Sequence, residues 1–133
     1  MQPLLDAPSP AVLTTYRKDG TALTTPVWFR FHAGAFEVVL AVGDVKREHL
    51  ARTPRCILVV FEAVPPFRGV EVKGQPELIE RDVTEVREAI AGRYLGEDRG
   101  RRFAANRRSR RGTLLRLVPD QPRVWDLAAV LPA

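Results

Sequence analysis

The sequence predicts a β-dominated α+β domain whose short antiparallel strands close, fully or partly, into a barrel. Two observations lead to this fold class. Runs of β-forming residues alternate with hairpin-type turns such as Lys18-Asp19-Gly20, and helical patterns are confined to a few short stretches. A chain of 133 residues has the length of one ordinary domain, so we expect residues 1–133 to form a single unit.

Six or seven strands should account for most of the chain. They share β-forming and apolar or alternating residues, and span residues 11–16, 21–31, 35–42, 55–63, 67–78, 113–118 and 123–127. Pro26 interrupts the second strand. Because proline has no N–H group to donate to a ladder, this strand is expected at a sheet edge, at a bulge or open to a ligand.

Two or three short helices complete the expected fold. The first, residues 44–52, begins at Asp44, whose carboxylate can cap the helix N-terminus. The second begins at Asp82 and carries an apolar stripe at steps of three and four residues until Gly96, which can end it. Residues 99–111 form either a further helix or a loop.

The positive charge of the chain is concentrated in one segment. The formal net charge is +5, and residues 99–111 hold seven arginines and no acidic residue, so the rest of the chain is slightly acidic. Such a run can be a solvated face, or it can contact an anionic cofactor or a nucleic acid. Nucleic acid is the less favoured partner, because Phe103 is the one aromatic residue in the segment and no stacking platform follows.

Residue types that carry catalysis are sparse. His32 and His49 are too isolated for a metal site, and we expect His49 to be solvated on a polar helix face. No nucleophile, zinc or phosphate-loop motif is present. If the protein is an enzyme, a cofactor must supply its chemistry.

Other features predict a soluble cytoplasmic protein. No apolar run approaches the roughly 18 residues of a membrane span, and residues 1–10 lack the basic start and apolar run of a signal peptide. The single cysteine, Cys56, cannot form an internal disulfide, and its apolar neighbours predict a buried thiol.

An ordered set of short segments, with matching gaps, resembles the pyridoxamine-phosphate-oxidase-like split-barrel proteins. The similarity is to the branch that includes deazaflavin (coenzyme F420)-dependent reductases. The segments are residues 12–20, residues 25–29, the pattern Lys46-x-x-x-Leu50-x-x-x-Pro54-Arg55, and residues 70–74, 93–96 and 123–126. The resemblance implies an antiparallel split β-barrel of six or seven strands.

The resemblance also implies a phosphate-bearing cofactor bound between the two subunits of a homodimer. The cofactor ring would lie against the strand that contains Pro26, and the phosphate would lie at the start of the helix that contains Lys46. The implied cofactor-binding residues are Thr25, Pro26, Val27, Trp28, Lys46, Arg47, Arg68 and Trp125. From the residues alone, a solvated Lys46 is favoured, Arg68 could be an exposed loop arginine, and Trp125 could equally be a core residue.

One stretch departs from the family pattern. Relatives often carry Thr, Ser or Arg before the phosphate-binding lysine, whereas residues 40–45 contain no hydroxyl group and no arginine. Asp44 would repel a phosphate. His49 stands where Asn is often found, and Arg47 or Arg52 could substitute for the missing phosphate ligands.

These features together predict a flavin- or deazaflavin-dependent oxidoreductase that transfers hydride to a small-molecule substrate. Coenzyme F420 is preferred because its polyanionic tail suits the arginines of residues 99–111, and FMN is the alternative. Trp28 and Trp125 could wall the substrate pocket. A non-catalytic FMN or F420 carrier or sensor and a basic nucleic-acid-binding protein are the other interpretations, and haem is disfavoured because no histidine is placed to ligate its iron.

Overall fold

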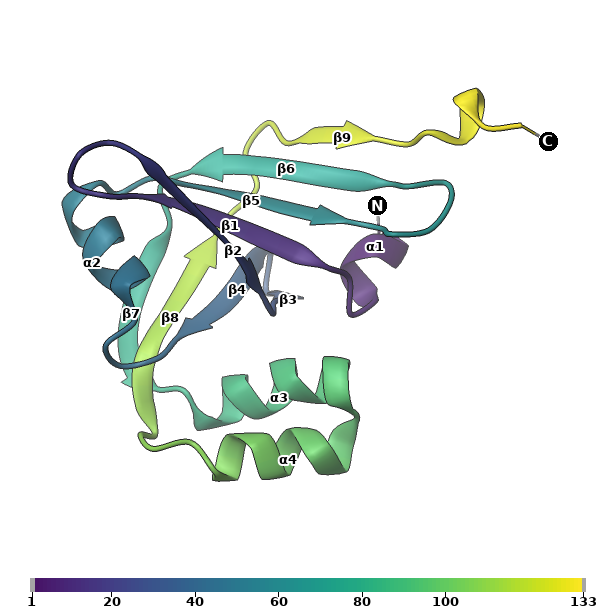
Figure 1. Cartoon of the computed structure of the whole chain (residues 1–133). Helices are drawn as coiled ribbons and strands as arrows, with labels where there is room; N and C mark the ends of the chain where they lie inside the picture. Colours follow the sequence, from purple (N-terminus) through teal and green to yellow (C-terminus); the bar gives the residue numbers. More distant parts are fainter. Residues whose placement is uncertain (1, 133) are drawn as a thin grey trace.

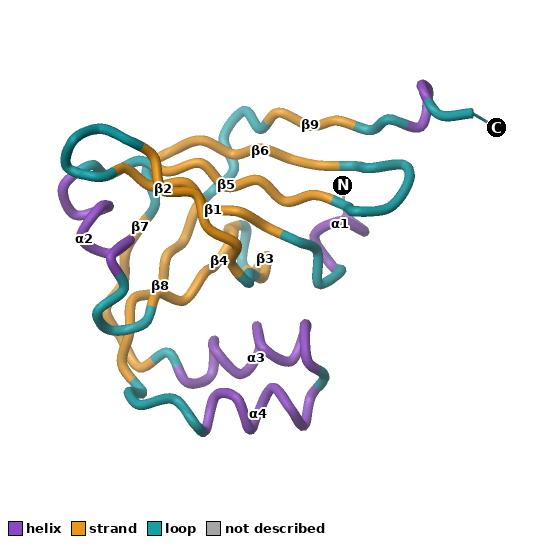
Figure 2. The backbone as a smooth tube through the Cα atoms, in the orientation of Figure 1, coloured by secondary structure: helices purple, strands orange, loops and turns teal. Residues whose placement is uncertain are grey.

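The computed structural model describes residues 2–132, and two antiparallel sheets form the framework of the fold (Figures 1 and 2). The strand order is β2-β1-β5-β6-β9 in the first sheet and β3-β4-β8-β7 in the second. The strands are β1 (Ala11–Tyr16), β2 (Ala22–Val27), β3 (Arg30–His32), β4 (Ala35–Leu40), β5 (Cys56–Phe61), β6 (Gly69–Gly74), β7 (Glu77–Asp82), β8 (Arg111–Leu117) and β9 (Arg123–Trp125). The β-dominated α+β class is confirmed.

The helices are short and lie around the edges of the two sheets (Figure 1). They are α1 (Gln2–Asp6), α2 (Val45–Arg52), α3 (Thr84–Leu95), α4 (Glu97–Ala105) and the 3-10 turn η1 (Ala128–Val130). Residues 99–105 thus belong to a helix, and α1 was not expected from the sequence. None of the helices in residues 2–132 is long and apolar enough to cross a membrane.

The described residues form nine strands rather than six or seven, because two expected strands are each divided. Residues 21–31 give β2 and β3, and residues 67–78 give β6 and β7, and in both cases the two halves belong to different sheets. The break before β7 coincides with Pro76, which has no N–H group for a ladder. The hydrophobic alternation continues across both breaks, so the pattern could not reveal the change of sheet.

The main hydrophobic core contains residues from both sheets and from α1 and α2. Alternate residues of β1 and β5 are buried, and Leu13, Leu58, Phe36 and Leu115 are at most 1% exposed. Cys56 belongs to this core, as predicted. Pro26 lies exposed on β2, which is an edge strand of the first sheet, so the interpretation of the proline is also confirmed.

His49 is buried, so the prediction that it is solvated is wrong. Its ring is 5% exposed, and Nδ1 lies 2.9 Å from the hydroxyl of Thr15 on β1. The hydrogen bond satisfies both groups away from water. It fixes α2 against the first sheet, and α2 begins as predicted at Asp44, whose carboxylate accepts a hydrogen bond from the backbone N–H of Lys46.

Helices α3 and α4 form an antiparallel hairpin that lies below the sheets in the view of Figure 1. Gly96, with φ of 89°, ends α3 and precedes α4. The two helices approach closely at two glycines, because a Cβ on Gly100 would lie 2.6 Å from the backbone of Gly92. The predicted apolar stripe of α3 is confirmed: Val86 and Ile90 are buried against the second sheet.

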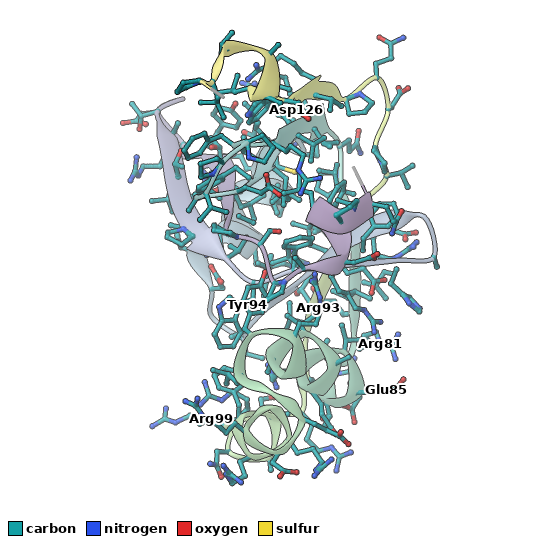
Figure 3. All side chains as sticks on the ribbon, turned by 90° about the vertical axis from the view of Figure 1, so that its right-hand side faces the viewer. Arg81, Glu85, Arg93, Tyr94, Arg99 and Asp126 are labelled. Atoms are coloured by element: carbon teal, nitrogen blue, oxygen red, sulfur yellow. The ribbon has the colours of Figure 1, made fainter. Side chains whose placement is uncertain are left out.

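Arg93 and Tyr94 join this helical hairpin to the sheets (Figure 3). Nη2 of Arg93 donates to the carbonyl of Leu5 at 2.8 Å, and its guanidinium also donates to the carbonyls of Ala7 and Phe29. The Tyr94 hydroxyl accepts from the backbone N–H of Phe29 and donates to the carbonyl of Ser9. The hairpin is therefore held in a fixed position beside β2 and the start of β3.

Candidate functional site

A cleft of about 270 Å³ separates the sheets from the helical hairpin. One wall is made by β2, the end of β4 and the start of α2, and the other by α3, α4 and the loop after α4. The lining residues are Pro26, Val27, Trp28, Val38, Val39, Leu40, Ala41, Asp44, Lys46, Arg87, Ile90, Phe103 and Arg107. The cleft thus collects residues from distant parts of the chain.

Trp28 lies between the cleft and the apolar groove that adjoins it, and it lines both. Its ring stacks on Tyr94 with centroids 5.1 Å apart and planes 10° apart, and it contacts Phe103 at 5.2 Å. Yet the indole remains 37% exposed. Burial raises the pKa of the Tyr94 hydroxyl above its ordinary value, so this group is protonated and able to donate at neutral pH.

Beyond Trp28 lies a wider apolar groove of about 740 Å³. It shares four lining residues with the cleft, and its full lining is Pro8, Pro10, Ala11, Val12, Pro26, Val27, Trp28, Phe61, Tyr94 and Phe103. The lining contains no charged residue. A flat apolar ring could therefore occupy the groove while a polar or charged extension enters the cleft.

Three cationic side chains face the cleft. Lys46 enters from α2 with its side chain 13% exposed, Arg87 from α3 with 7% of its surface exposed, and Arg107 from the loop after α4. Burial lowers the pKa of the Arg87 guanidinium, and the neighbouring Arg107 charge lowers it further, but an arginine stays charged at any ordinary pH. One carboxylate, Asp44, lines the same cleft.

These cations are poorly neutralised by the protein. Lys46 Nζ pairs with Asp44 at 3.2 Å. Within residues 2–132, no carboxylate lies within 4 Å of Arg87 or Arg107. Arg87 donates to the carbonyl of Ser109 at 2.9 Å, and Arg107 lies over the Phe103 ring at 4.1 Å. Because a buried charge without a counter-charge is costly, the cleft is chemically suited to an anion.

A larger hollow, of about 760 Å³, lies on the opposite side of α3 (Figure 3). Its lining mixes acidic residues such as Glu85 and Glu88 with bases such as Arg81 and Arg93, and contains no aromatic residue. Opposite charges offset one another there. The smaller cleft is the better candidate for two reasons. Two of its three cations have no carboxylate within 4 Å in residues 2–132, and it adjoins the apolar groove beside Trp28.

Four of the eight expected site residues meet in this cleft: Pro26, Val27, Trp28 and Lys46. Thr25 of β2 does not line the cleft. Its Oγ1 is buried without a hydrogen-bond partner in the described part of the chain. Arg87 was not expected here from the sequence, Phe103 was noted only as the single aromatic residue of residues 99–111, and Arg107 was not distinguished from the other arginines of that segment.

The other three expected residues lie away from the cleft. Arg47 pairs with Glu80 of β7 at 2.6 Å. Arg68 pairs with Glu62 across the loop between β5 and β6, and this ion pair lowers the pKa of the Glu62 carboxyl. Trp125 lies on β9, packed so closely on Gly69 that a Cβ there would be 2.0 Å from the indole.

The arginine-rich segment is divided among different roles. Arg101 pairs with Glu97 and Asp98 on α4 itself, and Arg110 pairs with Asp82 at the base of the hairpin. Arg107 faces the cleft, and Arg108 lines a neighbouring hollow of about 520 Å³ that shares Arg87 and Arg107 with the cleft. The segment is thus not one uniform solvated face.

The residues 1–126 match the sequence profile of the family described as pyridoxamine 5'-phosphate oxidase. The chain belongs to the pyridoxamine 5'-phosphate oxidase family. The match covers nearly the whole chain, so it includes both walls of the cleft. No curated protein matches the sequence.

Several solved structures share the fold of this family member. A conserved hypothetical protein of Mycobacterium tuberculosis has a TM-score of 0.78 at 22% identity, over 98% of this chain and 86% of its own. An F420 reductase has a TM-score of 0.66 at 20% identity, over 92% and 94%. An FAD-binding protein of Mesorhizobium loti has a TM-score of 0.65 at 17% identity, over 92% and 89%.

Proposed function

We propose that this member of the pyridoxamine 5'-phosphate oxidase family is an oxidoreductase that binds a phosphate-bearing flavin or deazaflavin, with coenzyme F420 preferred and FMN as the alternative. The observation that carries the proposal is the pairing of two adjoining hollows. One is an apolar groove walled by Trp28, and the other holds Lys46, Arg87 and Arg107 against a single carboxylate. A phosphate-bearing flavin likewise consists of a flat ring, which suits the apolar groove, and an anionic group, which suits the cationic cleft.

The chain's own residues would bind and orient the cofactor. Pro26 and Val27 offer a backbone edge, and the proline leaves one ladder position without a donor. Trp28 would lie beside the ring, and the apolar lining would keep water from it. A bound reduced flavin or deazaflavin would supply the hydride for an electrophilic small molecule, while the residues that line the cleft would bind and orient the ring.

The preference for coenzyme F420 has two supports. A solved structure that shares the fold is an F420 reductase, and Arg107 and Arg108 continue the positive charge outward from the cleft. FMN ends at its phosphate and would leave that outer charge unused. A long polyanionic tail would meet it.

A homodimer with split-barrel subunits fits the same geometry. The apolar groove beside Trp28 lies next to the edge strand β2, and a second copy covering it would exclude water from the ring. Exposed Val124 and Leu127 flank Trp125 on the C-terminal segment that extends beyond β6 (Figure 1). Trp125 could then approach the cofactor of the partner. Analytical ultracentrifugation at micromolar concentration should give twice the mass of the chain.

The proposal is tested by equilibrium titration with coenzyme F420, FMN and riboflavin, followed by fluorescence quenching. Micromolar or tighter F420 binding and weaker FMN binding are expected. Lys46→Ala should weaken the binding of both without changing the melting temperature of the cofactor-free protein by more than about 2 °C, because a single ion pair between partly exposed side chains contributes little. Failure of the wild-type protein to bind any of the three chromophores would overturn the proposed function.

A further inference from the structure

We infer that the anionic group of the ligand is held by Arg87 and Arg107 of the helical hairpin, and that Asp44 occupies the position at the start of α2 where such a group would otherwise bind. The inference rests on the proposed function for the identity of the ligand. It assigns the binding of a phosphate, or of a similar oxyanion, to residues on the opposite wall of the cleft from Lys46.

The start of α2 is already neutralised from within the chain. One carboxylate oxygen of Asp44 accepts the backbone N–H of Lys46 at 2.9 Å and lies 3.2 Å from Lys46 Nζ. The same carboxylate thus satisfies a free helix donor and the nearest cation. A phosphate that bound here would have to displace the Asp44 carboxylate or be repelled by its negative charge.

The opposite wall has cations without anions. Arg87 is more than nine-tenths buried, and in residues 2–132 its guanidinium reaches a backbone carbonyl, Ser109 O, but no carboxylate. A phosphate can accept two parallel hydrogen bonds from a guanidinium and also neutralise its charge. A backbone carbonyl accepts a hydrogen bond but carries no net charge. Burial and the charge of Arg107 lower the pKa of Arg87, and the charge of Asp82, which lies more than 4 Å away, offsets this only in part, so an anion between the two arginines would relieve a repulsion as well.

Arg87 and Arg107 also lie where two hollows meet. Both residues line the cleft beside Trp28 and the outer hollow between residues 41–42 and 106–109. An anion bound there would be reached from the aromatic groove on one side and from solvent on the other. The ligand would therefore bridge the sheets and the helical hairpin instead of binding to the sheets alone.

The experiment compares the affinity for FMN with that for riboflavin, which lacks the phosphate, in wild-type protein and in three variants. Arg87→Gln should reduce the FMN-to-riboflavin affinity ratio by about tenfold or more, the amount expected for a charge-assisted phosphate contact, with riboflavin affinity unchanged. Arg107→Gln should act in the same direction and, since Arg107 is exposed, it does not endanger folding. Arg99→Gln, an equal charge change on an exposed face of α4, should leave the ratio unchanged.

Asp44→Asn gives a change of the opposite sign. Asparagine is also a good N-cap, so α2 should keep its start, while the loss of the negative charge should raise the FMN-to-riboflavin ratio about threefold or more. A merely structural role for Asp44 would not increase affinity. If Arg87→Gln and Arg107→Gln keep the wild-type ratio while Lys46→Ala abolishes it, the anion binds at α2 and the inference is overturned.

Inorganic pyrophosphate separates this inference from the proposed function. If wild-type protein binds no chromophore, the proposed function fails, but saturable pyrophosphate binding measured by calorimetry at constant ionic strength should still weaken about tenfold in Arg87→Gln. Two results would overturn the anion site itself. One is equal pyrophosphate binding by wild type, Arg87→Gln and Arg107→Gln, and the other is no pyrophosphate binding by any of the three when the protein also binds no chromophore.

Discussion

The two walls of the cleft differ in how their residues are brought together. The wall formed by the sheets and the start of α2 takes its residues from two short stretches of the chain, 26–28 and 38–46. The wall formed by the helical hairpin takes Arg87 from α3 and Phe103 and Arg107 from α4 and the loop after it. The first wall depends on local strand geometry, and the second depends on how α3 packs on α4 and how both attach to the sheets.

The attachment through Arg93 should show the largest effect. Arg93→Met removes the donors that satisfy the carbonyls of Leu5, Ala7 and Phe29, and we expect a loss of about 3 kcal/mol in the free energy of unfolding, because the part-buried carbonyls of Leu5 and Phe29 are left unpaired. Arg93→Lys should recover less than half of that loss, since an ammonium cannot reach three acceptors as a guanidinium fork does. Urea denaturation of the three proteins measures this, and equal stability of all three would show that the hairpin is held by other contacts.

The contact between α3 and α4 offers a matched pair of substitutions. Gly100→Ala places a methyl group 2.6 Å from the Gly92 backbone, so the helices must separate, at a cost of about 2 kcal/mol. Gly92→Ala meets no atom within 4 Å and should stabilise the protein by up to about 1 kcal/mol through helix propensity. Chemical denaturation should give opposite signs. Equal effects of the two substitutions would mean that this close approach does not position the wall.

The wall formed by the sheets can be weakened at the anchor of α2. Thr15→Val leaves Nδ1 of His49 without its partner in a buried place, which should cost about 1–2 kcal/mol. Thr14→Val is the control, because Thr14 bonds Thr24 on the exposed side of the same strand and should change stability by less than about 0.5 kcal/mol. Thermal unfolding of both variants checks the difference, which would vanish if α2 did not depend on the buried hydrogen bond.

The smallest effect concerns acid at the base of the helical hairpin. Thr84, whose backbone N–H donates to Asp82 at 2.9 Å, and the charge of Arg110 lower the pKa of Asp82 from 3.8 to about 2. A lowered carboxyl pKa stabilises the fold fully above pH ~4 and loses that contribution as the pH falls toward 2. The unfolding midpoint of Asp82→Asn should therefore fall less steeply than that of wild type between pH 4 and 2, and parallel curves would contradict the assignment.

The sequence predicted the wall formed by the sheets better than the wall formed by the helical hairpin, for a physical reason. A proline inside a strand and an aspartate before a helix act on their immediate neighbours, so Pro26 and Asp44 could be interpreted correctly without tertiary information. Arg87 is one charged residue on a helix, and nothing local distinguishes a buried cation from a solvated one. The burial of His49 was missed for the same reason, because its partner Thr15 is distant in sequence.

Changes of sheet were the other gap in the prediction. The alternation that marks residues 67–78 is equally consistent with one long strand and with two strands, β6 and β7, joined at Gln75-Pro76. Periodicity reports which side chains share a face, but it does not report which neighbour a strand pairs with. The ordered family segments supplied the overall fold, whereas the contacts of Arg47, Arg68 and Trp125 with their partners required the structure.

The central claim is that a phosphate-bearing flavin or deazaflavin binds between the two walls. The most direct test is a titration of isotope-labelled protein with coenzyme F420 and with FMN, followed by proton–nitrogen correlation NMR. Saturable shifts of the Trp28 indole and of the backbone amides of residues 27, 28, 46 and 107 are expected for at least one cofactor. Saturable binding that leaves all of these signals unmoved, or no shift with either cofactor, would contradict the claim.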